Sequence, residues 1–203
     1  MERNLGYRAA VVDALAQRQS DLQGSLADLR AHAGAVAEAA QVLVEALQAG
    51  KKVLAAGNGG SAAQAQHFAA ELVGRFKRQR AAFAALALTT DTSILTAIGN
   101  DYGYADVFAR QVSGLGSPGD VLLLLSTSGE SENLVRAAEV AIQRRMPVIA
   151  ITGKRECRLA LAADVTVCSP AAESPLAQEL HLLVIHILCE IVETELSSGG
   201  SCL

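Results

Sequence analysis

The sequence predicts an α/β protein with a doubly wound, five-stranded parallel sheet flanked by helices and preceded by a helical extension. Three observations lead to this prediction. Five short apolar stretches recur between residues 52 and 169, and stretches with helical spacing separate them. Several of these stretches are apolar at nearly every position, which is typical of strands covered on both faces in a parallel sheet. The first 49 residues contain no proline and repeat apolar residues at helical spacing.

The N-terminal segment is expected to form two helices ahead of the sheet. Apolar side chains such as Leu15, Leu22 and Leu29 recur at helical spacing, the pattern breaks near residues 31–33, and Gly50 is placed to end the second helix. We therefore interpret the chain as a single domain. Its expected parts are N-terminal helices at 1–50, an α/β core with a C-terminal helix at 51–197, and a flexible tail at 198–203.

Strands and helices are expected to alternate along the rest of the chain. The expected strands are KVLAAG (52–57), FAALAL (83–88), DVLLLLS (120–126), PVIAIT (147–152) and DVTVCS (164–169). The expected helices are 61–75, a broken region at 92–115, 131–145, and a long last helix at roughly 175–197 that is apolar on one side. We find no internal repeat and no linker that would divide this pattern.

Composition and charge argue against a nucleic-acid-binding protein, a disulfide framework and a zinc ribbon. The formal net charge is -4 and there is no large basic stripe, which argues against nucleic acid as the main ligand. The one dense basic run, KRQR at residues 77–80, is expected to be a solvated helix end. The four cysteines lack CxxC spacing, so neither a disulfide framework nor a zinc ribbon is expected.

The same features favour a cytoplasmic protein without a membrane partner. The N-terminus, MERNLGYRAAVVDALAQRQ, carries charges of both signs and lacks the apolar centre of a signal peptide. No uninterrupted apolar run approaches the roughly 20 residues that a membrane helix needs. Unpaired cysteines fit a reducing compartment.

Two loops that follow separate strands have the composition of anion-binding sites. AAGNGGS ends the first expected strand, and STSGES (126–131) follows the third. Glycines let the backbone approach a ligand closely, and the start of the next helix offers free N–H groups. Each loop alone is a weak signal, because a glycine turn or a hydroxyl N-cap would explain it. Two such loops at the carboxyl ends of parallel strands favour binding of a phosphate monoester.

Polar side chains on two expected helices form a second candidate group. His67 and Glu71 are four residues apart and therefore share a helix face. Gln178, His181 and His186 lie in the strongly apolar last helix. Each histidine alone is explained as a core or interface side chain. Together, the histidines and Glu71 have the chemistry of a divalent metal site or of a proton-transfer pair, and the sequence does not decide between these roles.

The motifs, taken in order, resemble those of the sugar isomerase (SIS) domain family and, within it, of the phosphoheptose isomerases. They are GNGGSAAQAQHFAAEL, TAIGNDYG (96–103), GDVLLLLSTSGES, VIAITGK (148–154) and AQELHLLVIHIL (177–188). The resemblance implies a ketose–aldose isomerase that converts D-sedoheptulose 7-phosphate to D-glycero-D-manno-heptose 7-phosphate, or a related heptose 7-phosphate, through an enediol for activated-heptose biosynthesis. It also implies a homotetramer whose sites combine residues from neighbouring subunits.

Carried over by position, the resemblance implies roles for particular residues. The implied sugar contacts are Asn58, Gly59, Gly60, Asn100 and Asp101. The implied phosphate contacts are Ser61, Ser126, Thr127, Ser128 and Ser131. The implied zinc ligands are His67, Glu71, Gln178 and His186, of which Glu71 and Gln178 also contact the substrate. Glu71 and His186 are the implied acid–base pair.

The sequence departs from the family pattern at three places. Leu176 stands where an arginine is common, Glu130 stands where STSGNS has an asparagine, and KRECRLA (154–160) replaces a glycine-containing turn. Glu130 puts a negative charge next to the expected phosphate contacts, and Leu176 bears on substrate identity and on subunit contacts. None of the three removes a candidate catalytic residue.

Three other functions remain open at this point. A non-catalytic SIS protein that binds the bacterial replication initiator DnaA shares several motifs, but such relatives lack the acidic residue at the Glu71 position and the histidine at the His186 position. An isomerase for another sugar phosphate fits the same residues. A sugar-phosphate sensing domain of a regulator fits less well, because no helix-turn-helix segment accompanies it.

Overall fold

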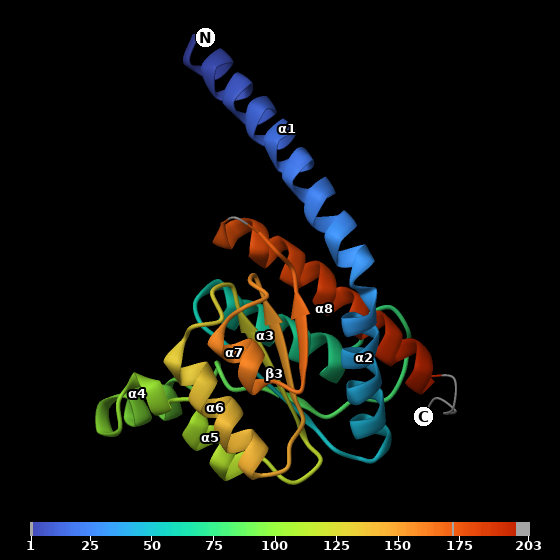
Figure 1. The fold of residues 1–203 in the computed structure, drawn as a ribbon, viewed down its shortest axis with the longest axis vertical. Helices are drawn as coiled ribbons and strands as arrows, with labels where there is room; N and C mark the ends of the chain where they lie inside the picture. Colours follow the sequence, from blue (N-terminus) through green and yellow to red (C-terminus); the bar gives the residue numbers. More distant parts are fainter. Residues whose placement is uncertain (1, 172, 198–203) are drawn as a thin grey trace.

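The computed structural model describes residues 2–171 and 173–197 and confirms the predicted doubly wound α/β fold (Figure 1). A parallel sheet of five strands has the order β2-β1-β3-β4-β5. The strands are β1 (Val53–Gly57), β2 (Ala85–Ala87), β3 (Val121–Ser126), β4 (Val148–Thr152) and β5 (Val165–Cys168). The expected tail at 198–203 lies outside the described residues.

Helices connect the strands and cover both faces of the sheet. They are α1 (Glu2–Ala31), α2 (Ala33–Gln48), α3 (Gly60–Val73), α4 (Thr92–Asp101), α5 (Ala109–Leu115), α6 (Glu132–Gln143), α7 (Arg158–Ala162) and α8 (Ser174–Ser197), with a 3-10 turn, η1, at Tyr104–Asp106. The predicted breaks near residues 31–33 and within 92–115 are confirmed. Helix α7 was not predicted, because five residues are too few to show helical periodicity.

Alternate residues of each strand belong to two separate cores. On one face, side chains such as Val53 and Leu123 pack with α2, α3 and α8. On the other face, side chains such as Leu54 and Leu122 pack with α5, α6 and α7. Successive side chains of a strand point to opposite faces, so a sheet covered on both sides needs apolar residues at every position. This requirement explains the continuous apolar runs in the sequence.

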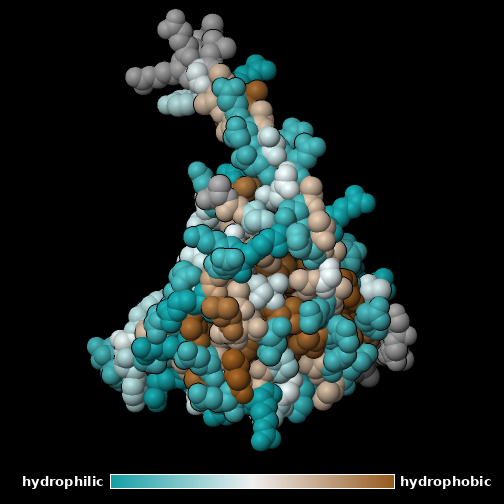
Figure 2. Space-filling model, in the orientation of Figure 1, coloured by the Kyte–Doolittle hydropathy of each residue, from teal (hydrophilic) through white to brown (hydrophobic). Residues whose placement is uncertain are grey.

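Helix α1 projects away from the body of the protein (Figure 1). Its side chains include Val11 and Leu15, which are 58% and 65% exposed. The helix is tied to the body near its C-terminal end, where Ser25 Oγ donates a hydrogen bond of 3.0 Å to the carbonyl of Pro170. Figure 2 shows hydrophilic and hydrophobic residues interspersed along the projecting helix. Most of α1 therefore has no core of its own to pack against within the described chain.

Helix α8 is long and apolar enough to cross a membrane, by length and composition alone. Half of that apolar window is buried inside the protein. Side chains such as Val184, Ile185 and Leu188 are fully buried in the core that α8 shares with α2, α3 and the sheet. The apolar character of α8 is thus explained by its place in the core.

A buried ion pair joins the segment after α3 to α8. The expected solvated helix end at KRQR is wrong, because α3 ends at Val73 and the following chain is irregular. The Arg80 side chain is only 4% exposed, and its Nε lies 3.2 Å from Oε1 of Glu193, whose side chain is 2% exposed. Arg80 Nη2 also donates a hydrogen bond of 2.7 Å to the carbonyl of Glu71.

The backbone completes the surroundings of Glu193. Its carboxylate accepts hydrogen bonds from the N–H groups of Phe76, Lys77 and Arg78 at 3.0, 2.7 and 2.8 Å. Burial alone raises the pKa of Glu193, but these N–H donors and Arg80 outweigh burial and hold the pKa below its ordinary value. Glu193 therefore stays ionised and fastens the whole segment 76–80 onto α8.

The buried ion pair gives a prediction for stability. Replacing Glu193→Gln leaves the Arg80 charge buried without its partner, and removing one member of a buried pair costs roughly 3–5 kcal/mol. Glu190→Gln is the matched control on the same helix, because Glu190 pairs with Lys77 at the surface, where side chains are 54% and 58% exposed. Such exposed pairs contribute at most about 1 kcal/mol. Urea denaturation of both variants checks the difference, and equal losses would contradict the role given to Glu193.

His181 gives a prediction for pH dependence. Its side chain is fully buried, and burial lowers its pKa from 6.5 to about 4. The unfolded chain therefore binds a proton between these two pKa values while the folded chain does not, so stability falls as the pH falls from 6.5 to 4. We expect the free energy of unfolding to be about 2 kcal/mol lower at pH 5 than at pH 8 from this group.

The His181→Leu variant isolates this effect. It replaces the ring with an apolar side chain, so its free energy of unfolding should vary less between pH 8 and pH 5 than that of the unmodified protein. Chemical denaturation at several pH values measures the two slopes. Equal slopes would show that His181 is not the group responsible.

Candidate active site

The strand order brings the two candidate loops into one crevice. Strands β1 and β3 are neighbours, and Gly57 pairs with Leu125 in their register. Helix α3, which follows β1, packs into the core on one face of the sheet, whereas α6, which follows β3, packs into the core on the other face. Ligands of doubly wound proteins bind at this kind of switch point, beyond the carboxyl ends of the strands.

A small pocket of about 80 Å³ lies between the two loops. It is lined by Asn58, Ser61, Leu125, Ser126, Thr127, Ser128, Ser131 and Gln178. Pockets that enclose a whole drug-sized ligand measure roughly 300–1,000 Å³. The pocket therefore suits one end of a larger molecule, such as a phosphate group. Every residue predicted to contact phosphate lines it.

The starts of two helices supply the pocket with hydrogen-bond donors. Gly59 is the N-cap of α3 and Ser131 is the N-cap of α6. The first N–H groups of a helix have no intrahelical partner, and its N-terminus carries partial positive charge. Within the described chain the Ser131 side chain makes no capping hydrogen bond, so its hydroxyl is available to a ligand. The pocket can thus bind a phosphate although no lysine or arginine lines it.

Hydroxyl groups and a glycine shape the loop between β3 and α6. Ser126 Oγ accepts a hydrogen bond of 3.0 Å from the N–H of Gly129, and Ser128 Oγ accepts one of 3.2 Å from the N–H of Glu130. Gly129 has a φ of +71°, and a Cβ built there would lie 2.5 Å from the Cβ of Cys157. The loop therefore requires glycine at this position for both conformation and space.

The negative charge of Glu130 is directed away from the phosphate pocket. Its carboxylate accepts a hydrogen bond of 3.3 Å from the N–H of Arg158, the first residue of α7. Glu130 is not among the residues that line the pocket described above. The departure from the family pattern at this position is thus compatible with phosphate binding.

The second cluster, formed by His67, Glu71 and His186, joins α3 to α8. The Nε2 atoms of the two imidazoles lie 3.0 Å apart, and Glu71 Oε1 lies 3.1 Å from His67 Nε2. One candidate ligand atom from each residue lies within 4.8 Å of the others. The ring of Phe76 packs against His186 with ring centroids 5.4 Å apart. The sequence-based pairing of these three residues is therefore seen in the structure.

The geometry of this cluster fits a divalent metal ion. Two nitrogens bound to the same tetrahedral zinc at about 2.0 Å lie roughly 3.3 Å apart, close to the observed separation. Two histidines and one glutamate also match a common ligand set of catalytic zinc sites, which keep a further position open. The His67 side chain is 44% exposed and that of Glu71 is 22% exposed, so the cluster is open to ligands.

Gln178 lies at the phosphate pocket and not beside His186. A Cβ built on Gly60 would lie 2.6 Å from Gln178 Nε2, and Gln64 Nε2 donates a hydrogen bond of 2.5 Å to the Gln178 carbonyl. Gln178 and His186 are eight residues apart on α8, which separates them by roughly 12 Å along the helix axis. The predicted ligand set is therefore not brought together within a single chain.

The predicted sugar contacts fall into two groups. Asn58 lines the phosphate pocket, with Gly59 and Gly60 next to it at the start of α3. Asn100 and Asp101 are exposed at the end of α4, where Asn100 Nδ2 donates a hydrogen bond of 2.8 Å to Asp101 Oδ1. Neither of these two residues lines the pocket, so their role in this chain stays a prediction.

Sequence reasoning missed two side chains that bond to Asn58. Asn133 exchanges two hydrogen bonds with it, and the Tyr104 hydroxyl donates a third. Asn133 lies two residues after the STSGES motif and Tyr104 directly after TAIGNDYG, so adjacency to these motifs was the available signal.

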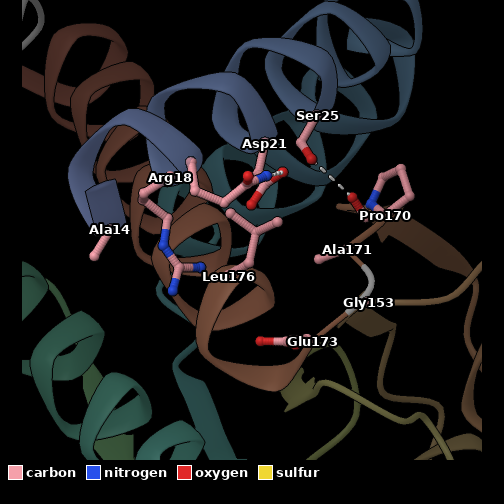
Figure 3. Close-up of a pocket in the computed structure, with 10 residues that line it drawn as sticks. Ala14, Arg18, Asp21, Ser25, Gly153, Pro170, Ala171, Glu173 and Leu176 are labelled. Atoms are coloured by element: carbon pink, nitrogen blue, oxygen red, sulfur yellow. Dashed lines mark hydrogen bonds between the residues drawn. The ribbon is translucent and has the colours of Figure 1, made fainter. Parts of the chain in front are cut away.

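A larger cavity of about 810 Å³ lies between α1 and the start of α8 (Figure 3). Leu176, which is 5% exposed, lines it together with Arg18 and Asp21 of α1. Gly153 lines this cavity and packs closely against the phosphate loop, because a Cβ there would lie 2.6 Å from the carbonyl oxygen of Thr127. Leu176 is thus placed as a packing residue under α1, outside the two clusters described above.

This combination of fold and site defines a sugar isomerase domain. The family described as the SIS domain matches residues 19–153, about two thirds of the chain, and the chain belongs to this family. Within it, the relatives are phosphoheptose isomerases. The enzyme of that name from Thiobacillus denitrificans is 51% identical over 87% of this chain and 91% of its own length, and that from Helicobacter hepaticus is 49% identical over 82% and 85%.

Solved structures agree with the sequence comparison. The phosphoheptose isomerase GmhA from Neisseria gonorrhoeae has a TM-score of 0.84 and 41% identity, covering 93% of this chain and 99% of its own. The phosphoheptose isomerase from Francisella tularensis has a TM-score of 0.85 and 37% identity, covering 91% and 98%. The similarity thus extends over nearly the whole length of each protein.

The loop glycine gives a prediction for phosphate binding. Gly129→Ala places a side chain at positive φ, which costs roughly 1–2 kcal/mol, and drives it into Cys157. This strain lowers the melting temperature, and the loop must shift to relieve it. Returning the loop to the shape that binds phosphate then costs a similar energy, so we expect about tenfold weaker binding of inorganic phosphate, since 1.4 kcal/mol corresponds to tenfold. Calorimetric titration measures the binding.

Gly114→Ala is the matched control for this prediction. Gly114 lies in α5, and a Cβ built there meets nothing within 4 Å. Alanine is favoured over glycine in a helix, so stability and phosphate binding should be kept. Unchanged phosphate binding in Gly129→Ala would contradict the assignment of this loop.

Proposed function

We propose that the protein converts D-sedoheptulose 7-phosphate to D-glycero-D-manno-heptose 7-phosphate by ketose–aldose isomerisation, as a step in activated-heptose biosynthesis. The observation that carries the proposal is the convergence of His67 and Glu71 on α3 with His186 on α8. Helix α3 also begins at the phosphate pocket. Both the names of the relatives and their similarity over most of the chain support it.

The residues present suit this chemistry. Isomerisation moves one proton between C1 and C2 and another between the two oxygens, with an enediol in between. Glu71 takes the proton from one carbon and returns it to the other, so the carboxylate is regenerated in each turnover. His186 carries the other proton between the two oxygens. The serines at the start of α6 hold the phosphate far from the reacting carbons, so their contribution is positioning.

A divalent ion, for which zinc is the proposed choice, would be held by His67, Glu71 and His186. When bound, it polarises the substrate carbonyl and stabilises negative charge on the adjacent oxygen. The three side chains already converge without it, which limits the reorganisation needed on binding. Their open arrangement leaves room for a fourth ligand, for which we propose Gln178 of a neighbouring subunit.

Distances along the helices support a site shared between subunits. Ser61 at the phosphate pocket and Glu71 are ten residues apart on α3, so they are separated by roughly 15 Å along the helix axis. A fully extended heptose 7-phosphate spans only roughly 10 Å, given C–C bonds of about 1.5 Å. We therefore propose a homotetramer in which the phosphate pocket of one subunit faces the His67–Glu71–His186 cluster of another. The exposed apolar residues of α1, such as Val11, fit an additional subunit contact.

The remaining partners follow from the same reaction. The proposed substrate is a phosphorylated sugar, and neither nucleic acid nor a membrane is required. We propose a cytoplasmic location. Among the described residues, Cys157, Cys168 and Cys189 are free and buried thiols, which fits a reducing compartment.

The first test is turnover. Purified protein supplied with zinc should convert sedoheptulose 7-phosphate to an aldose, seen as new anomeric proton signals and as solvent deuterium incorporation. In Glu71→Gln, kcat should fall by roughly 10²–10⁴-fold, because a positioned general base is lost. Glu190→Gln on the exposed side of α8 should keep full activity. No turnover by the unmodified protein would contradict the reaction, and an active Glu71→Gln would contradict the role of Glu71.

The second test concerns the metal. Treatment with a chelator should abolish turnover, and zinc should restore it. His186→Ala should lower the amount of zinc bound per chain, measured by atomic emission after dialysis, because one of three converging ligands is removed. His32→Ala is the control, since His32 lies at the break between α1 and α2 and bonds to the carbonyl of Asp28. Full zinc content in His186→Ala would show that the ion is bound elsewhere.

A further inference from the structure

The side chain of Asn58 is held by two residues that come from different parts of the chain. Asn58 Nδ2 donates to Asn133 Oδ1 at 3.0 Å, and Asn133 Nδ2 donates back to Asn58 Oδ1 at 2.9 Å. The Tyr104 hydroxyl donates to the same Asn58 Oδ1 at 3.1 Å. Asn133 is 3% exposed and Asn58 is half-buried, so the amide pair is partly shielded from solvent at the wall of the pocket.

Counting donors and acceptors shows what Asn58 can offer to a ligand. An asparagine amide has two N–H donors and an oxygen that accepts two hydrogen bonds. Asn133 and Tyr104 occupy both acceptor positions of Asn58 Oδ1, and Asn133 occupies one N–H. Within the described chain, one N–H of Asn58 remains without a partner. Asn58 lines the pocket, so the group that it presents to a ligand is a donor only.

The supports of Asn58 are themselves fixed by α6. Asn133 lies in the first turn of this helix, and Arg136 lies one turn later, where its Nη1 bonds to Asp106 of η1 at 3.0 Å. Hydrogen bonds from Arg158 and Arg136 hold the pKa of Glu132, also in the first turn, below its ordinary value. The start of α6 therefore positions both the buried amide and, through Arg136, the turn that carries Tyr104.

We propose that Asn133 and Tyr104 are positioning residues that commit the Asn58 amide to donating a hydrogen bond to an acceptor oxygen of the substrate. This inference rests on the isomerase function proposed above and adds two residues to it. In this proposal the acceptor oxygen belongs to the sugar, where negative charge develops during the reaction and strengthens the hydrogen bond. Misdirecting the amide therefore lowers kcat more than it raises KM. The five hydroxyl-bearing residues that are predicted to contact the phosphate are left unchanged.

The test is a double-mutant cycle with Asn58→Ala. Asn133→Leu should lower kcat/KM by roughly 10–100-fold and Tyr104→Phe by roughly 3–10-fold, since each leaves a hydrogen-bonding group of Asn58 unmatched. In the Asn58→Ala background, each change should add less than about twofold, because both residues act through Asn58. The dissociation constant of inorganic phosphate, measured by calorimetric titration, should stay within about twofold in Asn133→Leu and Tyr104→Phe, because neither residue lines the pocket.

The test includes a variant at an exposed position and a matched control. Tyr104 is 62% exposed, so Tyr104→Phe will fold even if Asn133→Leu does not. Tyr102→Phe is the matched control, because Tyr102 is 55% exposed and packs on Arg110 at 3.8 Å without contacting Asn58. It should leave kcat/KM unchanged.

Three results would overturn the inference. They are additive losses in the Asn58→Ala background, a parallel loss of phosphate binding, and an equal effect of Tyr102→Phe. If the unmodified protein fails to isomerise any heptulose phosphate, the proposed function fails and the inference with it. If the unmodified protein is active and the losses are additive, only the inference fails.

Discussion

The packing of α3 against α8 is the constraint on which the proposed chemistry depends. The buried pair of Arg80 and Glu193 fastens the segment after α3 to the second half of α8. Arg80 also bonds to the carbonyl of Glu71, so the same guanidinium fixes the backbone of the proposed base. Together with the apolar core that α3 and α8 share, this contact holds Glu71 and His67 opposite His186. A charged residue in a buried position, costly by itself, is thus used to set the relative position of two helices.

The two ends of the proposed active site, the phosphate pocket and the His67–Glu71–His186 cluster, depend on different physical interactions. At the phosphate end, glycine conformations and unsatisfied N–H groups of two helices create a donor-rich pocket. At the other end, side chains on rigid helices bring two imidazoles and a carboxylate together. Helix α8 contributes Gln178 to the first end and His186 to the second, and its length separates them. A substrate that needs both ends therefore calls for more than one copy of this helix.

Much of the fold could be predicted from the sequence, because apolar runs and helical spacing report directly on a two-faced parallel sheet. The serines of the phosphate loop and the His67–Glu71 pair were found for a similar reason, since each depends on local spacing. Interactions between residues far apart in the sequence could not be predicted from it. The sequence suggested a solvated helix end at Arg80 because its acidic partner is 113 positions away. Likewise, the distance between Gln178 and His186 is known only once α8 is seen as one continuous helix. The hydrogen bonds between Asn58 and Asn133 depend on β1 and β3 being neighbours in the sheet.

The projecting helix α1 has a consequence for how the protein responds to dilution. Val11 and Leu15 find no core among the residues that the structure describes, and most helical stability in proteins comes from tertiary packing and not from propensity. In the assembly that we propose, neighbouring copies supply that packing. The fraction of chains in which α1 is folded therefore depends on association, by mass action. Helix α1, about a seventh of the chain, would then respond to the abundance of the protein and become fully helical only where the protein is concentrated enough to assemble.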